Sequence, residues 1–157
     1  MPHTRLIVLV LVVAVAGCAS NPTRLGTPAV GPHSSPELAA LAYMMERASS
    51  PAERETYSTY VVPKSPLGDA AVRAFAGNSP PVSNAAEVDM TSGAARDSAN
   101  GRRVKTWDAK VLELDGDRAV VAVDWYSANL ASGVHVIELA WREGKWVFVK
   151  QRTAFVS

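Results

Sequence analysis

Cysteine and histidine are scarce in this chain of 157 residues. The single cysteine, Cys18, excludes an internal disulfide bond, and with it the class of small disulfide-stabilised secreted domains. His3 lies near the N-terminus, His33 lies in a Pro-rich stretch, and only His135 falls in the β-rich C-terminal half. A transition-metal site built from several Cys and His ligands is therefore excluded. We expect no metal and no other cofactor.

An excess of one charge is also missing, because the chain has 16 Lys and Arg residues and 15 Asp and Glu residues. The formal net charge of +1 excludes a nucleic-acid binder that relies on bulk positive charge. The sequence has no Gly-rich phosphate-binding loop and no G-x-S-x-G nucleophile motif. Charge and motifs therefore predict no nucleic-acid partner and identify no known type of catalytic centre.

A long hydrophobic run is absent as well. The apolar run over 6–16 has eleven residues and follows the basic residue Arg5. A transmembrane helix needs about 20 residues to cross the hydrocarbon core, so this run is too short to span a bilayer. Its length and its basic flank are typical of a signal peptide, which we assign to 1–17.

The tetrapeptide V-A-G-C at 15–18 resembles the lipobox of bacterial lipoprotein signal peptides. The resemblance covers the first 20 residues. It implies that the Cys18 thiol accepts a diacylglyceryl group and that cleavage leaves Cys18 as the mature N-terminus. The alternative is a plain secretory signal in which Cys18 is a small buried hydrophobic residue.

The same resemblance predicts a location in the bacterial cell envelope. Several acyl chains on Cys18 would anchor the protein stably, whereas a single chain binds a membrane only reversibly. Ala19 and Ser20 follow the cysteine in place of the Asp that tends to retain lipoproteins at the inner membrane. We therefore expect the membrane as a partner and, in a Gram-negative cell, the outer membrane facing the periplasm. An envelope protein is a further possible partner.

A spacer of 18–34 should separate the anchor from a single α+β domain over 35–157. Residues 19–35 contain three prolines, two glycines and few large apolar residues. Such a segment cannot bury enough apolar surface to offset its chain entropy, so we predict that it is disordered.

Three Ser-Pro pairs, at 35–36, 50–51 and 65–66, predict three helix starts over 36–77. Serine accepts a hydrogen bond at the N-cap, and proline is tolerated in the first helical turn because its missing N–H has no helical partner there. At the second start, Glu53 completes a capping box with Ser50. The following segment, 78–101, is too long for an ordinary connection. Either residues 86–90 form a short strand within it, or the segment is a mobile loop. We favour a partly ordered loop.

From 103 onward the hydrophobic period is two, which predicts strands. The expected strands cover 103–114, 118–127, 133–142 and 145–155, and short turns join them into an antiparallel meander. The predicted fold class is α+β, with about three N-terminal helices packed on a curved, cone-like sheet of four strands.

A two-residue turn at 143–144 would determine the register of the last hairpin. The resulting pairs are Arg142 with Lys145, Trp141 with Trp146, Leu139 with Phe148, and Ile137 with Lys150. We expect His135, Lys150 and Arg152 further along the face that these aromatic residues share. The Trp141–Trp146 pair should be a structural part of the core.

The helices, the meander and the hairpin over 138–148 resemble the nuclear-transport-factor-2-like, or cystatin-like, α+β cone superfamily. A short hairpin usual between the second and third helices is not evident, unless Val61-Val62 is its remnant. The resemblance implies that enzymes of this kind use an Asp or His base facing an apolar pocket. The catalytic candidates here are His135, Asp124 and Asp108, and the candidate walls of a binding site are Trp107, Trp125, Tyr126 and Trp141.

Two functions remain open at this point. The first is a non-enzymatic lipoprotein whose domain binds or scaffolds another envelope component. The alternative is a cone-fold enzyme of the isomerase or cyclase kind, or a carrier, acting on a small apolar ligand. The two differ in whether His135, Asp124 and Asp108 point together into a cone or out to solvent.

Overall fold

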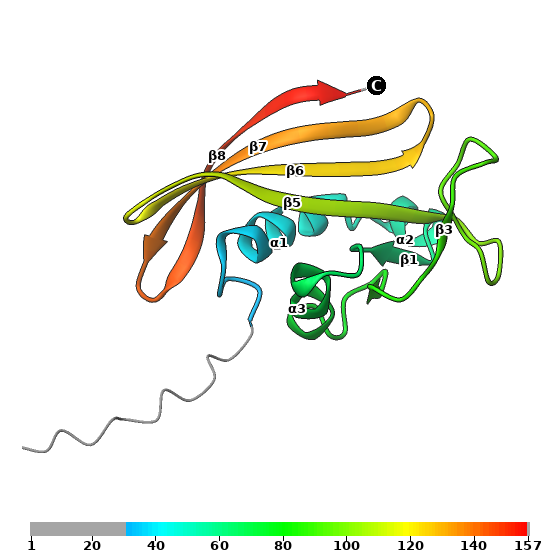
Figure 1. The fold of residues 1–157 in the computed structure, drawn as a ribbon, viewed down its shortest axis with the longest axis horizontal. Helices are drawn as coiled ribbons and strands as arrows, with labels where there is room; N and C mark the ends of the chain where they lie inside the picture. The colour runs from blue at the N-terminus through cyan, green and yellow to red at the C-terminus, as the bar shows by residue number, and fades with distance from the viewer. Residues whose placement is uncertain (1–30, 157) are drawn as a thin grey trace, which may run out of the picture.

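The computed structural model describes residues 31–156 (Figure 1). The expected signal peptide, Cys18 and the first part of the expected spacer lie outside these residues. Within 31–156, no helix is long and apolar enough to cross a membrane.

The three Ser-Pro pairs begin the three helices, which are α1 (Pro36–Ala48), α2 (Pro51–Thr56) and α3 (Pro66–Ala74). In each helix the hydroxyl of the preceding serine accepts a hydrogen bond from a backbone N–H of the first turn. Helix α1 buries an apolar stripe in the core, whereas α2 has no buried residue. The short helix α2 is therefore held by contacts other than apolar packing.

The α+β class is confirmed, but the main sheet has six strands in the order β2-β1-β5-β6-β7-β8. The long strands β5 (Val104–Asp115), β6 (Arg118–Ala128), β7 (Ala131–Arg142) and β8 (Lys145–Val156) pair antiparallel. The prediction of four strands missed β1 (Thr59–Val61) and β2 (Val82–Ser83), which extend the sheet by parallel pairing beside β5. Strand β1 lies between α2 and α3, and its three residues include Val61.

The segment 78–101 contains more regular structure than the expected loop. It supplies β2 and also a small second sheet of β3 (Val88–Asp89) and β4 (Arg96–Asp97). Ala95 packs with Val61 and Val104 in a small apolar cluster separate from the main core. The small residues of this segment thus pack against the β1 end of the sheet.

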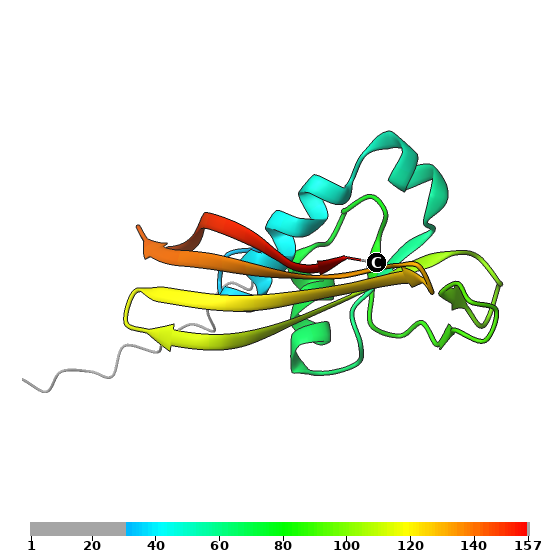
Figure 2. The same ribbon diagram turned by 90° about the horizontal axis from the view of Figure 1, so that it is seen from above.

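The main core lies between α1 and one face of the sheet, and Figure 2 shows α1 and α2 on the same side of the strands. We call this the helix-side face, and we call the opposite face of β5–β8 the open face. Among the most deeply buried residues are Leu38 and Leu41 of α1, Trp107 of β5, and Val121 and Val123 of β6.

The predicted register of the β7–β8 hairpin is confirmed near its turn, where Trp141 pairs with Trp146 and Leu139 with Phe148. It is wrong farther along, because a β-bulge shifts the pairing between Glu138 and Leu139. Ile137 consequently pairs with Gln151 rather than Lys150. The extra residue moves Lys150 and Arg152 to the face of Glu138 and brings Gln151 to the face of His135.

Trp141 is less buried than predicted. The two indole rings of the pair meet edge to face, with their centroids 5.4 Å apart. Trp146 is only 8% exposed, but Trp141 is 41% exposed because it lies near the end of the hairpin. Only Trp146 is therefore a core residue, and the core assignment of Trp141 is wrong.

The folded part of the chain starts before Ser35. The backbone N–H of Trp146 donates a hydrogen bond to the His33 carbonyl over 3.2 Å. The His33 ring nitrogen Nδ1 lies 3.1 Å from the Trp146 carbonyl oxygen and must donate there, since a carbonyl only accepts. His33, which we expected in the spacer, is thus attached to the first residues of β8.

Candidate functional site

The predicted site residues lie on both faces of the sheet. Cross-strand partners share a face, and Trp107 is paired with Trp125 while Asp108 is paired with Asp124. Trp107 is buried in the core beneath the helices, so the two aspartates belong to the open face. His135 pairs with the core residue Val123 and belongs to the helix-side face. The structure therefore does not bring His135 together with the two acids.

Lys105 is the central charged residue of the helix-side face. Its Nζ atom lies 4.5 Å from the Trp125 ring centroid, 5.0 Å from that of Trp107 and 5.6 Å from that of Tyr57. The same atom forms an ion pair of 3.1 Å with Glu53 Oε1. The Lys105 side chain is only 7% exposed, so aromatic faces and one carboxylate replace most of its hydration. Our sequence interpretation missed this lysine, although its period-two spacing from Trp107 places both on one face.

Glu53 connects α2 to this cluster. Ser50 caps α2 by accepting a hydrogen bond from the Glu53 backbone N–H, as the capping-box motif predicts. The Glu53 carboxylate, however, turns toward the sheet and binds Lys105. Its second oxygen, Oε2, is buried without a hydrogen-bond partner among the described residues, and so is the indole nitrogen of Trp107. The cluster thus contains one unused acceptor and one unused donor.

His135 is held in one tautomer by its neighbours. The Trp125 indole N–H donates to His135 Nε2 over 3.3 Å, and an indole nitrogen cannot accept. The neutral imidazole therefore carries its proton on Nδ1, which lies 3.3 Å from the Thr153 hydroxyl and 2.8 Å from the Gln151 carboxamide. The Gln151 atom at this distance is the amide nitrogen Nε2, which only donates, so the Thr153 hydroxyl is the acceptor of the Nδ1 proton.

Gly133 makes room for this arrangement. A Cβ atom at position 133 would lie 2.7 Å from the Trp125 indole nitrogen and 3.0 Å from the Phe155 carbonyl oxygen. A larger residue would therefore push the indole off strand β7 and away from His135. The glycine is required by this close approach.

The pKa of His135 predicts how stability depends on pH. Burial lowers this pKa below the usual 6.5, and the positive charge of Lys105 lowers it further. Between 6.5 and the lowered value, the unfolded chain binds the proton more readily than the folded chain does, so stability must fall as the pH falls. The contribution of His135 is fully present above pH 6.5 and is lost as the pH drops through the folded-state pKa.

We therefore expect the melting temperature to be lower at pH 5.5 than at pH 7.5, and the difference to shrink in His135→Gln. Thermal unfolding followed by circular dichroism at the two pH values measures this. Carboxylates titrate mainly below this window and are shared by both proteins. An equal difference in both proteins would contradict the assignment to His135.

Asp108 and Asp124 face each other on the open face. Burial raises the pKa of Asp124, and the negative charge of Asp108 raises it further. The two residues line a shallow hollow of about 120 Å³ together with Thr106 and Tyr126. Tyr126 pairs with Thr106 and so lies on the face of the acids, and its hydroxyl donates to Asn129 Oδ1 over 2.9 Å. These residues form an exposed polar edge of the open face.

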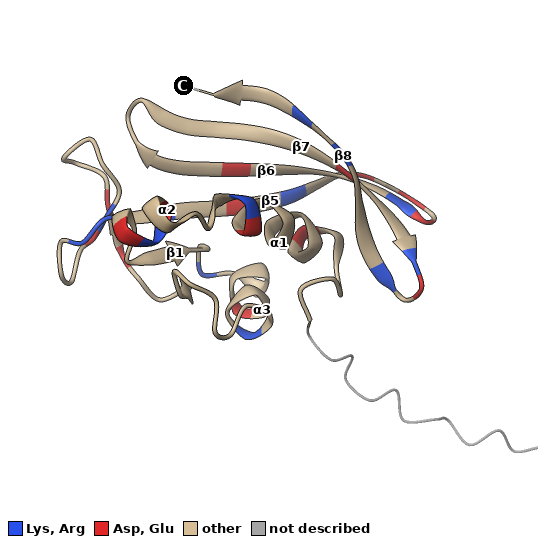
Figure 3. Ribbon diagram, turned by 180° about the vertical axis from the view of Figure 1, so that it is seen from behind, with Lys and Arg blue, Asp and Glu red and all other residues tan. Residues whose placement is uncertain are grey.

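Glu138 forms a second charged centre on the open face. Figure 3 shows acidic and basic positions close together along β7 and β8. Its carboxylate lies 3.2 Å from Lys150, 3.5 Å from Arg152 and 3.7 Å from Arg118. The Glu138 side chain is 13% exposed, whereas its three partners are largely solvated. Glu138, Arg118 and Arg152 help to line a hollow of about 200 Å³, to which Glu113 and Asp115 also contribute, so three acidic and two basic side chains surround it.

Half-buried apolar residues lie among the charged residues of the open face. Strand alternation and cross-strand pairing assign five of them to this face, which are Val120, Ala122, Val134, Val136 and Ala140. The described helices pack on the opposite face of these strands.

Within residues 31–156, no cluster of three or more His, Cys, Asp or Glu side chains could hold a metal ion. No protein-family model, curated protein or solved structure matches this chain.

Proposed function

We propose that this protein is a lipid-anchored lipoprotein of the bacterial cell envelope whose α+β domain binds another envelope component without catalysing a reaction. The lipobox-like tetrapeptide at 15–18 supports the anchor. In this proposal the domain is cone-like, as the resemblance to the nuclear-transport-factor-2-like superfamily implies, and the outer membrane is its location in a Gram-negative cell.

The observation that carries the proposal is the separation of the titratable residues by the sheet. An acid–base enzyme needs its proton-transferring groups within reach of one substrate. His135 faces the helices, where Trp125 and Thr153 occupy its two nitrogens, while Asp108 and Asp124 face the opposite side. This geometry favours binding over catalysis.

The open face supports binding of a partner protein. Its half-buried small and β-branched residues alternate with charged ones, since Val120 pairs with Glu138 and Val134 pairs with Asp124. Apolar contacts mixed with polar and charged groups are typical of non-obligate protein–protein interfaces. We assign the partner surface to this face.

The anchor is tested with Cys18→Ser in the full chain. In a bacterial host that processes lipoproteins, we expect the wild-type chain in the membrane fraction, with its N-terminal peptide carrying acyl groups in mass spectrometry. The variant should accumulate as unmodified precursor. An unmodified peptide running through Cys18 in the wild-type protein would rule the anchor out.

The partner surface is tested by photo-crosslinking in the same cells. A crosslinking amino acid replaces Val136 on the open face or, as a control, Leu130, which is 87% exposed in the turn between β6 and β7. We expect a defined crosslinked species from position 136 only, and Ala122→Arg should abolish it. Equal crosslinking from both positions, or no effect of Ala122→Arg, would contradict the assignment.

A carrier of a small ligand is the second candidate, because the unpartnered Glu53 Oε2 and Trp107 indole N–H point to a polar group between α2 and the sheet. Native mass spectrometry of the full chain should then reveal a bound small molecule, and Trp107→Phe should release it.

A further inference from the structure

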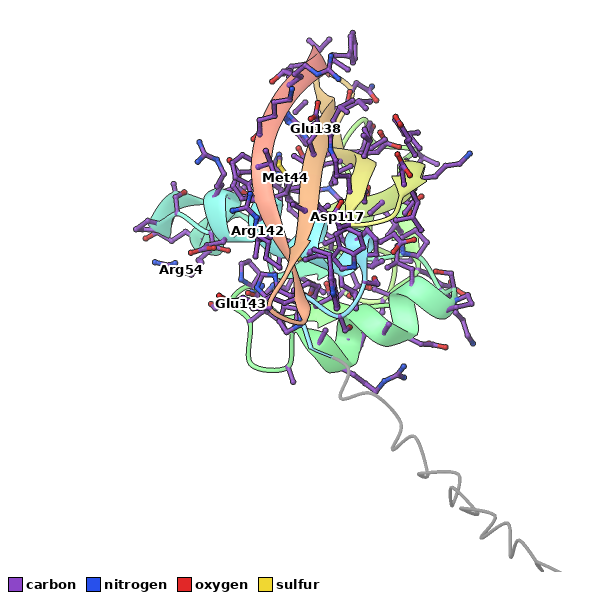
Figure 4. The ribbon with its side chains drawn as sticks, turned by 90° about the vertical axis from the view of Figure 1, so that its left-hand side faces the viewer. Met44, Arg54, Asp117, Glu138, Arg142 and Glu143 are labelled. Atoms are coloured by element: carbon purple, nitrogen blue, oxygen red, sulfur yellow. The ribbon has the colours of Figure 1, made fainter. Side chains whose placement is uncertain are left out.

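The described chain enters the fold beside the turns at one end of the sheet (Figure 1). His33 is hydrogen-bonded to Trp146, the second residue of β8, so the entry point lies next to the β7–β8 turn. The β5–β6 turn lies at the same end, since the Trp141 N–H donates to the Asp117 carbonyl over 2.6 Å. Figure 4 views the molecule from this end and labels Arg142 and Glu143 of the β7–β8 turn and Asp117 of the β5–β6 turn.

Among the large apolar side chains exposed near this end, three share one face of the sheet, and we call them the hairpin patch. Leu114 is 61% exposed, and Trp141 and Phe148 are each 41% exposed. All three share the helix-side face, because Leu114 and Leu139 both pair with Ala119, Phe148 pairs with Leu139, and Trp141 follows Leu139 by two residues.

The hairpin patch rests on a rigid base. The Phe148 ring stacks on the Tyr43 ring of α1, with a centroid distance of 3.9 Å and an interplanar angle of 7°. Trp141 packs edge to face against the buried Trp146. The exposed rings are therefore held in place from below and present apolar surface outward at little cost in side-chain entropy.

Basic residues border the hairpin patch. Arg142 and Lys145 flank Glu143 in the β7–β8 turn, which leaves this turn with one net positive charge. The Arg47 guanidinium lies 5.4 Å from the Tyr43 ring centroid. Aromatic residues mixed with Lys and Arg are typical of surfaces at the headgroup level of a bilayer, where apolar bodies meet acyl chains and charged ends meet water.

A lipid anchor at Cys18 would leave the hairpin patch within reach of a membrane. Thirteen peptide steps separate Cys18 from Gly31, the first described residue. At about 3.3 to 3.6 Å per residue, they extend to no more than about 47 Å. Gly31 lies two residues before His33, and His33 is bound at the base of the β7–β8 hairpin. A chain attached at Cys18 can therefore bring this end of the sheet to the bilayer.

We propose that the hairpin patch docks on the lipid surface to which the protein is anchored, with Leu114, Trp141 and Phe148 inserted at the interface. This proposal rests on the proposed anchoring through Cys18. Acidic residues of the β5–β6 turn offset the basic ones at this end, so apolar insertion supplies the attraction and a zwitterionic bilayer is sufficient. Docking would hold the strands upright and leave the open face free for a partner.

Tryptophan fluorescence tests the proposal in the full chain. All four tryptophans lie at or beyond position 107, so a signal from them cannot come from the anchor segment. The chain is purified from membranes and reconstituted into phosphatidylcholine vesicles with or without brominated acyl chains, because bromine quenches only nearby indoles. We expect quenching in the brominated vesicles, most of which is lost in Trp141→Phe but kept in Trp125→Phe.

A second variant guards against local misfolding. Leu114→Glu changes the most exposed residue of the hairpin patch and should reduce the quenching of Trp141 at least twofold. The matched control is Phe155→Glu, which alters an equally apolar residue, 56% exposed, near the far end of β8, and should leave the quenching unchanged. Circular dichroism checks that both variants fold.

The other outcomes overturn the proposal. If the vesicle-bound wild-type chain shows no quenching, the domain does not touch the bilayer and the docking proposal fails. The proposed anchor would not be affected by this result. If Trp141 is not quenched and crosslinking shows that it lies in a dimer contact, the hairpin patch binds a second copy of the chain instead. If the chain is recovered soluble, the proposed anchor fails, and mixing it with the same vesicles still decides whether the patch binds lipid.

Discussion

Replacing Trp146 by Ala is expected to lower the free energy of unfolding by about 3 to 5 kcal/mol, the usual cost of truncating a buried aromatic residue. Trp146 is 8% exposed, packs in the main core and also holds His33 through its backbone. Trp141→Ala should cost only about 1 kcal/mol or less, because its ring is 41% exposed and loses mainly the cross-strand contact.

Urea denaturation followed by circular dichroism measures both variants against the wild-type chain. Each variant is a control for the other, because both replace a tryptophan by alanine and the two tryptophans form one cross-strand pair. Equal destabilisation would show that Trp141 is a core residue after all. It would also weaken the membrane-docking proposal, which needs Trp141 to be available at the surface.

Removing the Glu53 carboxylate should produce the second large effect. In Glu53→Ala, the Lys105 ammonium stays in a site where only 7% of its side chain meets solvent, but without its counterion. An unpaired buried charge of this kind costs about 3 to 5 kcal/mol when fully enclosed. Because Glu53 is 25% exposed and the aromatic rings still attract the cation, we expect about 2 to 3 kcal/mol here.

The matched control is Glu55→Ala, which removes an exposed carboxylate from the same helix and should change stability by about 0.5 kcal/mol or less. The double variant Glu53→Ala/Lys105→Met removes both charges and should be more stable than Glu53→Ala alone. If the double variant is less stable than Glu53→Ala, the ion pair is not the reason for the loss, and Lys105 stabilises the fold by packing.

The helix starts were predictable because they depend on local chemistry. A serine before a proline supplies both the N-cap acceptor and a compatible first turn, whatever the rest of the chain does. The register of the last hairpin was predictable for the same reason near its turn. The bulge at Val149 was not, because it depends on how β8 fits its neighbour and on no residue that signals it. One extra residue then reversed the faces of Lys150 and Gln151.

The candidate site was only partly predictable for a related reason. Alternation along each strand could place Trp107 and Lys105 on one face. It could not predict how deeply α2 buries them. The pair Lys105–Glu53 joins residues 52 positions apart, and the sequence carries no local sign of it. Likewise, the separation of His135 from the acids depends on the pairing of β5, β6 and β7, which composition does not reveal.

The attachment of His33 to Trp146 also has a mechanical consequence. If the domain is pulled through its N-terminal end, the load reaches the two His33–Trp146 hydrogen bonds before it reaches α1 or the core. Each such bond contributes only about 1 kcal/mol, so these bonds give way first. A few residues of slack are then released while the sheet stays intact. The attachment would act as a weak link that gives way before the domain unfolds when the N-terminal end is pulled.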